Sequence, residues 1–320
     1  MNKLTRFAKY AWFLVVYLVF VNLAGVLVRA TGSGAGCGSH WPLCNGEVTP
    51  SLERLETVIE LSHRLVAALA GVLVIILLVW ALRRFPRGHR VRQGAWWTFV
   101  FILMEGAAGA ALVRFEWVAD DVSLGRVIAM SVHLIITFIL VAVAGLTAWW
   151  ASGGRRVRVR GQGTIRWWLL AGFAAMFFLG VSGSITALGD TIFPSDSLAE
   201  GIARDFSDTA HFLERLRVYH PIIAVFTGLY LAVVAGVIRG ESENETTRRL
   251  ALSVNAVFLL QLGVGMVNLV LLAPIWMQLV HLAMADLVWM NWVLLAASRL
   301  SEPALEGRRM KAEVGESMLG

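Results

Sequence analysis

Long apolar runs alternate with short polar segments along nearly the whole chain. A helix rises about 1.5 Å per residue, so a run of about 18 residues or more can cross a hydrocarbon core of roughly 30 Å. Eight such runs lie at about 11–28, 62–82, 95–113, 127–150, 165–187, 218–238, 249–272 and 275–298. The pattern predicts an all-α integral membrane protein with eight transmembrane helices. Only Ala273-Pro274 separates the last two runs, so their boundary is the least sharply defined.

The composition agrees with this pattern. Of the 320 residues, 58% are apolar and only 16% are charged. A soluble domain of this length would need more charged residues to cover its surface. We therefore expect the lipid bilayer to be the chain's main partner.

Basic residues concentrate in alternate polar segments. If the N-terminus is cytoplasmic, the termini and loops on that side hold 20 of the 28 basic residues, and the opposite loops hold 13 acidic residues. This asymmetry follows the positive-inside rule and predicts a multi-pass plasma-membrane protein with both termini in the cytoplasm. The first run is longer than the apolar part of a signal peptide and lacks a clear cleavage motif, so we expect it to be retained. The net charge of +6 then reflects topology and not a nucleic-acid partner.

Short motifs recur in the same order in the two halves of the sequence. The matched pairs are residues 25–32 and 180–187, His63 and His220, 105–109 and 261–265, and 132–134 and 280–282. Because each unit has four spans, both copies face the same way, and a pseudo-twofold axis along the membrane normal should relate them. We predict an N-terminal four-helix bundle over 1–150, an Arg-rich cytoplasmic linker over 151–164, a second bundle over 165–300 and a cytoplasmic tail over 301–320.

Four of the seven histidines occupy equivalent places, near the outer ends of spans 2, 4, 6 and 8: His63, His133, His220 and His281. Two imidazoles that face each other inside a bundle suit axial ligation of haem iron. A zinc site is disfavoured, because each half offers two such histidines and no nearby thiolate. The alternative is that each histidine satisfies a local hydrogen bond at the interface. We expect His89, in an Arg-rich cytoplasmic loop, to be solvated, and His211, in the outer loop before span 6, to have a surface role and not to bind a ligand.

The surroundings of the first histidine distinguish the two halves. Glu60 precedes His63 by three residues and shares its helical face. A carboxylate there could orient the imidazole, transfer protons or stabilise positive charge, or it could simply be solvated by outer water. Arg217 occupies the equivalent place before His220. This difference suggests that one site performs chemistry while the other carries electrons.

Arginines near the histidines are candidates for binding an anion. Haem propionates at the outer interface would favour a cation, and Arg64, with Arg215 or Arg217 in the second half, is placed for that role. The alternative is that these side chains extend to the headgroup region without a ligand.

Both cysteines, Cys37 and Cys44, fall in the first outer loop, which also contains several glycines. The outer compartment permits a disulfide. Three interpretations remain open here: a structural disulfide, a redox-active dithiol, and a metal site. A metal site is disfavoured because Cys37, His40 and Cys44 supply only three ligands.

Taken together, these residues resemble the haem A synthase family over spans 1 to 8. The most specific segments are Arg29-Ala30-Thr31-Gly32-Ser33-Gly34, the stretch from Cys37 to Cys44 with Trp41-Pro42-Leu43, and Glu60-Leu61-Ser62-His63-Arg64. The resemblance implies an enzyme that oxidises a ring methyl of haem O to a formyl group, giving haem A for terminal oxidases. The family's scheme is successive hydroxylations followed by loss of water.

The resemblance also implies roles for individual residues. His63 and His133 would flank the substrate haem O, and Glu60 would be essential to catalysis. His220 and His281 would be the axial ligands of a permanent haem b that passes electrons. Cys37 and Cys44 would be the family's outer-loop pair. Haem O synthase, a protohaem farnesyltransferase, and an electron acceptor of unknown identity would be partners.

Several positions depart from the family pattern. Residues 190–194 replace a second cysteine pair that some relatives have after span 5. Glu105 and Asp286 are acids inside spans 3 and 8, where a wet cavity or a neighbouring helix must satisfy them. Pro221 follows His220 where Arg64 follows His63, so the propionate contacts of the second haem need not match those of the first.

Other classes of function share some of these features. A di-haem b-type cytochrome that exchanges electrons with quinone would also need four histidines, but it would not need Glu60 beside His63. A haem chaperone or transporter would also place histidines at one membrane face. A thiol–quinone oxidoreductase would need more cysteines than the two present.

Overall fold

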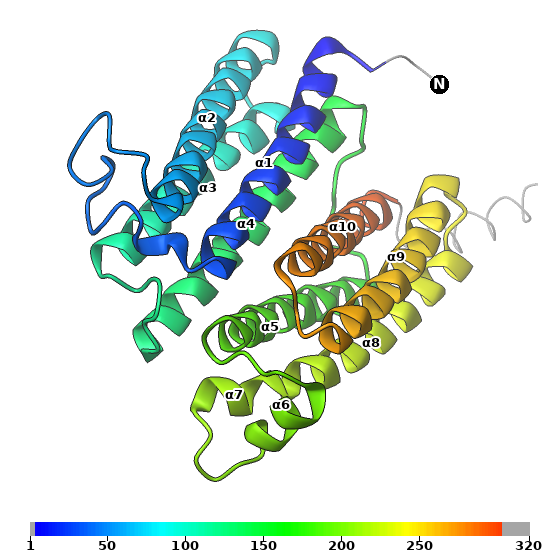
Figure 1. Cartoon of the computed structure of the whole chain (residues 1–320). Helices are drawn as coiled ribbons and strands as arrows, with labels where there is room; N and C mark the ends of the chain where they lie inside the picture. Colours follow the sequence, from blue (N-terminus) through cyan, green and yellow to red (C-terminus); the bar gives the residue numbers. More distant parts are fainter. Residues whose placement is uncertain (1–3, 303–320) are drawn as a thin grey trace, which may run out of the picture.

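The computed structural model describes residues 4–302, and helices form most of this part of the chain (Figure 1). The long helices are α1 (Arg6–Ala30), α2 (Leu55–Arg84), α3 (Arg90–Arg114), α4 (Leu124–Ala151), α5 (Ile165–Ile192), α8 (Tyr219–Glu241), α9 (Glu245–Val270) and α10 (Ile275–Arg299). Short helices are η1 (Ser33–Ala35), α6 (Leu198–Asp205) and α7 (Phe212–Arg217). No β-strand occurs within residues 4–302. Eight segments are long and apolar enough to cross a membrane, with α7 and α8 forming one of them, and this confirms the predicted fold class.

Several helices begin well before the apolar runs that predicted them. The second run was expected at 62–82, but α2 starts at Leu55 and includes Glu56 and Glu60. Hydropathy falls at charged residues, whereas the helical backbone continues through them because its hydrogen bonds do not depend on side-chain polarity. His63 and His133 therefore lie more than two turns inside their helices rather than in the first turn or two.

The junction between the last two spans is a tight turn. Leu272 and Ala273 adopt positive φ angles of 60° and 51°, and Ala273 N–H donates to the carbonyl of Asn268. Pro274 then precedes the first residue of α10, where a missing N–H costs no helical hydrogen bond. The predicted boundary at Ala273-Pro274 thus lies inside this turn.

The eight spans form two groups of four. Helices α1–α4 pack together, α5 and α8–α10 form the second group, and α1 and α4 face α5 and α10 across the interface (Figure 1). The aromatic ring of Phe138 in α4 stacks on Trp289 of α10, and Trp289 Nε1 donates to the Phe138 carbonyl at 2.8 Å. The predicted pseudo-twofold axis stays a prediction.

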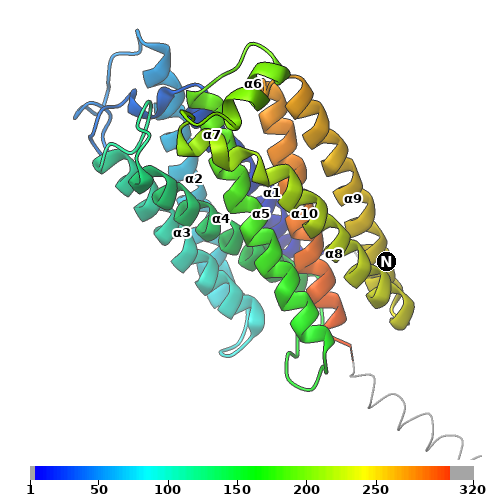
Figure 2. The same cartoon turned by 90° about the horizontal axis from the view of Figure 1, so that it is seen from below.

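The connections separate to the two ends of the molecule. Figure 2 shows the loop after α1, α6 and α7 at one end, and the connections α2–α3 and α4–α5 at the other. The segment predicted as a linker runs between Ala151 and Ile165. Of the predicted tail over 301–320, residues 303–320 lie outside the described residues.

Candidate functional site

Each of the four histidines packs its ring against a glycine of the preceding span. A Cβ atom added to Gly25 would lie 3.1 Å from His63 Cε1, and one added to Gly109 would lie 3.6 Å from His133 Nε2. In the second half, the corresponding distances are 2.9 Å from Gly183 to His220 Cε1 and 3.0 Å from Gly265 to His281 Cε1. All four glycines belong to the motifs that recur between the two halves. A Cβ atom at Gly25, Gly183 or Gly265 would crowd the imidazole, whereas the distance at Gly109 is an ordinary van der Waals contact.

The rings of His220 and His281 face each other inside the second bundle. Their centroids lie 6.4 Å apart and their planes are nearly perpendicular, at 86°. Two iron–nitrogen bonds of about 2 Å, plus about 1.2 Å from each nitrogen to its ring centre, would separate the centroids by about 6.4 Å. This pair therefore fits axial ligation of a haem.

A serine sets the orientation of His220. Ser182 Oγ lies 3.0 Å from His220 Nδ1 and donates its own proton to the carbonyl of Leu179 at 2.9 Å. Because the serine proton is used there, Ser182 accepts from Nδ1–H of a neutral imidazole. His220 Nε2 is then left with a lone pair, which is the form that binds a metal.

A carboxylate orients His133 in the first bundle. Glu105 Oε1 lies 2.9 Å from His133 Nδ1 and accepts from Thr137 Oγ1 at 2.5 Å. The acid inside span 3 thus contacts a neighbouring helix. Gln261 occupies the equivalent place and donates to the His281 carbonyl at 3.1 Å. A carboxylate that accepts from one imidazole nitrogen holds the ring and makes the other nitrogen a stronger ligand.

Two of the four imidazoles have a buried nitrogen with no partner. These atoms are His63 Nδ1 and His281 Nδ1, and no donor or acceptor among residues 4–302 reaches them. A buried unpaired nitrogen is costly unless a ligand or water satisfies it. Together with the ring separation in the second half, this supports a site built for a group that these histidines bind.

Glu60 is buried and tied to the cysteine loop. Glu60 is only 3% exposed, and its Oε2 accepts from Cys37 N–H at 2.8 Å. Oε1 accepts from Arg64 Nη2 at 2.6 Å. Arg64 Nη1 donates to the carbonyls of His40 and Leu43, each at 2.8 Å. The carboxylate is therefore held by the loop and is not solvated by outer water.

Cys37 and Cys44 form a disulfide, which confirms the disulfide among the three interpretations of this pair. Both residues are buried, at 0% and 2% exposure. A sulfur in a disulfide is not a thiolate and cannot bind a metal as one, so the alternative of a metal site at Cys37, His40 and Cys44 is wrong. No cluster of three or more potential metal ligands occurs in the described part of the chain. The ring closed by the disulfide contains the carbonyls that bind Arg64.

In the second half, Arg217 contacts two acids that the sequence did not single out. Arg217 Nε donates to Asp205 Oδ1 at 2.6 Å and Nη1 donates to Asp190 Oδ1 at 3.3 Å. Burial raises the pKa of the Asp205 carboxyl, and the hydrogen bond and charge of Arg217 oppose that shift. Arg215 binds the loop carbonyls of Asp208 and Ala210. A propionate role for Arg64 or Arg217 stays a prediction, since each is paired with a carboxylate here.

Two further outer residues have roles that sequence reasoning missed. Arg29 of α1 crosses the interface between the bundles and donates to Thr191 Oγ1 and Gln278 Oε1, each at 2.7 Å. Its place in the glycine-rich motif was the available signal. His211, for which we expected a surface role, accepts from the Leu213 N–H at the start of α7 and completes a capping box with Glu214.

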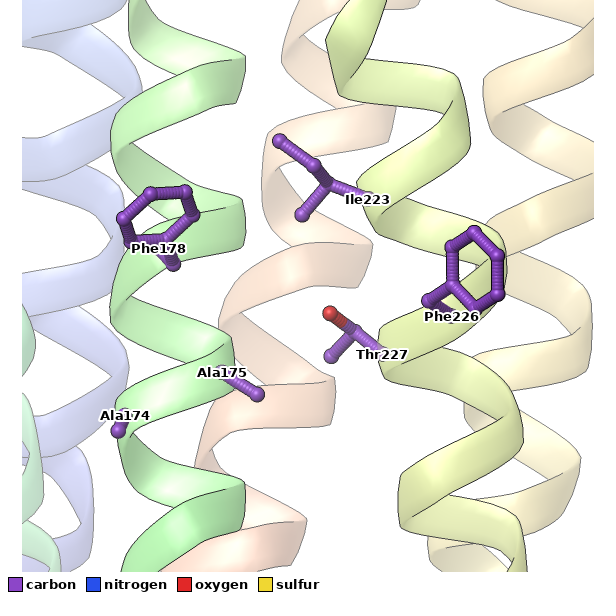
Figure 3. Close-up of a pocket in the computed structure, with 6 residues that line it drawn as sticks. All are labelled: Ala174, Ala175, Phe178, Ile223, Phe226 and Thr227. Carbon is purple, nitrogen blue, oxygen red and sulfur yellow. The ribbon is translucent and has the colours of Figure 1, made fainter.

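A shallow apolar groove of about 390 Å³ lies between α5 and α8 (Figure 3). Ala174 and Ala175 of α5 and Thr227 of α8 line it, together with Ile223, which lies three residues after His220 on α8. Phe178 and Phe226 border it and are 70% and 69% exposed. Because these rings lie in transmembrane segments, the groove faces lipid.

The chain is similar to one protein family and to several known proteins. The family model of COX15-CtaA cytochrome oxidase assembly proteins matches residues 8–293. A Protoheme IX farnesyltransferase of Thermus thermophilus is 47% identical over 263 residues, which cover 82% of this chain and 43% of that protein. The Heme A synthase of Geobacillus kaustophilus is 48% identical over 96 residues, or 30% of each chain. The Heme A synthase of Bacillus cereus is 44% identical over 111 residues, covering 34% of this chain and 35% of its own. The chain thus spans less than half the length of each of these relatives.

Proposed function

The chain belongs to the COX15-CtaA family of cytochrome oxidase assembly proteins, and from that premise we propose that it is a haem A synthase. It oxidises a ring methyl of haem O to a formyl group and so acts as an oxidoreductase. The observation that carries the proposal is the His220–His281 pair, whose ring separation of 6.4 Å matches that of two ligands on one iron. The repeated glycine contacts extend the same design to His63 and His133.

The two halves have different tasks in this proposal. His220 and His281 hold a permanent haem b, with Ser182 fixing the His220 tautomer. His63 and His133 hold the substrate haem O. The bound haem b would supply one-electron redox chemistry. The contrast between Glu105 and Gln261 beside otherwise equivalent histidines supports this inequality of the halves.

Glu60 is the catalytic carboxylate in this proposal. Conversion of a methyl to a formyl group adds one oxygen atom, which water can supply, and releases protons and electrons. The electrons pass to the proposed acceptor, and the substrate site needs a group that accepts the protons. Glu60 is buried beside the outer loop and precedes His63 by less than one turn. Cys37 N–H and Arg64 donate to the two oxygens of this carboxylate and fix its position. The Cys37–Cys44 ring keeps these donors in place.

The substrate would come from haem O synthase, a protohaem farnesyltransferase. A longer Thermus thermophilus protein named as a Protoheme IX farnesyltransferase contains a segment 47% identical to this chain, which supports direct transfer between the two activities. The electrons leave to an acceptor at the membrane. The plasma membrane, cytoplasmic termini and outward-facing haem sites follow from the distribution of basic residues.

Haem analysis of cells tests the activity. The chain is expressed in cells that make haem O but no haem A, and the extracted haems are separated by chromatography. We expect a formyl haem to appear with the wild-type chain and not with the matched His63→Ala variant. If the protein retains bound haem but no formyl haem forms, the chain is a di-haem cytochrome and not a synthase.

A further inference from the structure

A buried acid lies at the interface between the two bundles and has no task in the proposed chemistry. Asp286 of α10 is 2% exposed. Both of its carboxyl oxygens accept from Asn22 Nδ2 of α1, at 3.0 and 3.3 Å. Within residues 4–302 no cation pairs with this carboxyl group. A permanent negative charge held there by one amide alone would be strongly unfavourable inside a bilayer.

The pair joins the two histidine sites. On α1, Asn22 lies less than one turn from Gly25, the glycine that supports the His63 ring. On α10, Asp286 lies five residues after His281, a rise of about 7.5 Å along the helix. The Asn22–Asp286 hydrogen bonds thus connect α1, which packs behind His63, with α10, which carries His281.

No other titratable group acts on this carboxyl from the helices packed against α10. On α1, Tyr17 donates to the Val66 carbonyl, and Arg29 donates to Thr191 of α5 and to Gln278, eight residues before Asp286 on α10. His133 on α4 binds Glu105. The remaining candidates lie near helix ends: Arg6, Lys9 and Tyr10 on α1, Arg126 on α4, Arg166 and Asp190 on α5, and Glu245, Arg248 and Arg249 on α9. Asp286 is therefore the titratable group placed to compensate a change in charge at this part of the interface.

We propose that Asp286 is a proton-binding site coupled to the redox state of the haem held by His220 and His281. The proposal rests on the haem b site proposed above. When one electron reaches that haem from a one-electron reductant such as dithionite, the Asp286 carboxylate takes up one proton from water, so the net charge of the interior does not change. In a low-dielectric interior an uncompensated charge is costly, which couples the two events. Asn22 stabilises the ionised form by donating to both oxygens.

Redox titration of the purified, haem-loaded protein at a series of pH values tests this. With one proton taken up per electron, the midpoint potential falls by up to about 59 mV for each tenfold drop in proton concentration. Asp286→Asn keeps the shape of the side chain but cannot bind the proton, and we expect it to reduce this slope by at least half. The matched control is Asn291→Ala, which lies on α10 like Asp286. It removes the hydrogen bond from Ser253 Oγ of α9 to Asn291 Oδ1 but does not remove an acid. It should keep the wild-type slope.

Infrared difference spectra between the oxidised and reduced protein provide a second measurement. We expect a carboxylic-acid carbonyl band that changes with redox state in the wild type and in Asn291→Ala and disappears in Asp286→Asn. An unchanged slope in Asp286→Asn with haem bound overturns the inference and leaves the proposed function intact. If Asp286→Asn retains no haem, the infrared difference spectrum of the wild type is the test. Absence of the carboxylic-acid carbonyl band from that spectrum overturns the inference. A wild-type protein that binds no haem overturns both proposals.

Discussion

At the scale of single residues, hydrogen bonds fix the direction of the side chains around the histidines in each bundle. Ser182 and Glu105 each hold one nitrogen of a histidine and so direct the other nitrogen inward. Glu60 is held differently, because Cys37 N–H donates to one carboxylate oxygen and the Arg64 guanidinium donates to the other. In the proposed function, these contacts distinguish the residues that orient the histidine ligands from Glu60, the carboxylate proposed to take part in the reaction.

Replacing Glu60 tests that distinction. Glu60→Gln keeps the volume of the side chain but cannot accept a proton, and positioned acid–base groups contribute roughly 100-fold or more to rates. We expect formyl-haem production to fall by at least that factor while the haem b spectrum is unchanged. Glu56→Gln is the matched control, because it removes a carboxylate from the same helix where the side chain is 47% exposed and pairs with Arg54; it should leave product levels unchanged. Wild-type product levels in Glu60→Gln would remove Glu60 from the mechanism.

Removing a ligand of the second pair tests the assignment of the two halves. In both His220→Ala and His281→Ala we expect the absorption spectrum of the permanent haem to be lost, because one axial bond to iron is missing. The corresponding His133→Ala variant should retain that spectrum, since it alters only the substrate half. A spectrum that survives both substitutions in the second half would mean that the halves are assigned the wrong way round.

At the scale of the elements, four glycines set how closely neighbouring helices approach each imidazole. Gly183 on α5 is the tightest case, since its Cβ position lies 2.9 Å from His220 Cε1. A real Cβ contact is essentially never that short, so the ring would have to move. Helix-to-helix distance is thus part of the ligand geometry.

Gly183→Ala should therefore weaken haem b binding. Overpacking a tight contact costs about 1–3 kcal/mol, and each 1.4 kcal/mol corresponds to about a tenfold change in affinity. We expect roughly tenfold faster haem loss to an acceptor such as apomyoglobin, followed by absorbance. Gly236→Ala on α8 is the control, because nothing lies within 4 Å of its Cβ position. Equal rates for both variants would contradict the role of the glycine contact.

At the scale of the whole molecule, the arrangement of the connections agrees with the distribution of charge: loops with many basic residues and loops with many acidic residues lie at opposite ends. The cysteine loop and the α6–α7 segment gather at one end, and the connections rich in arginine gather at the other (Figure 2). The interface between the bundles carries Trp289, Arg29 and the Asn22–Asp286 pair. The two halves are therefore joined by polar contacts as well as by packing.

Reporter fusions test the predicted orientation. Alkaline phosphatase is active only outside the cytoplasm, so a fusion after residue 208 should be active and one after residue 160 inactive. A fluorescent protein joined to the C-terminus should fluoresce, because that end is predicted to be cytoplasmic. The reverse pattern would show that the histidine sites face the cytoplasm.

The sequence by itself determined the spans, their order and the four histidines, because membrane insertion depends on local hydropathy and a repeat preserves spacing. It also identified Glu60, the cysteine pair and the glycine motifs. Only the tertiary structure decided which groups contact them: Glu60 with Cys37 N–H, Glu105 with His133, and Asp286 with Asn22. Asn22 and Asp286 are 264 residues apart along the chain. Such contacts depend on how helices approach and rotate about one another, and the packing of many side chains sets that geometry together.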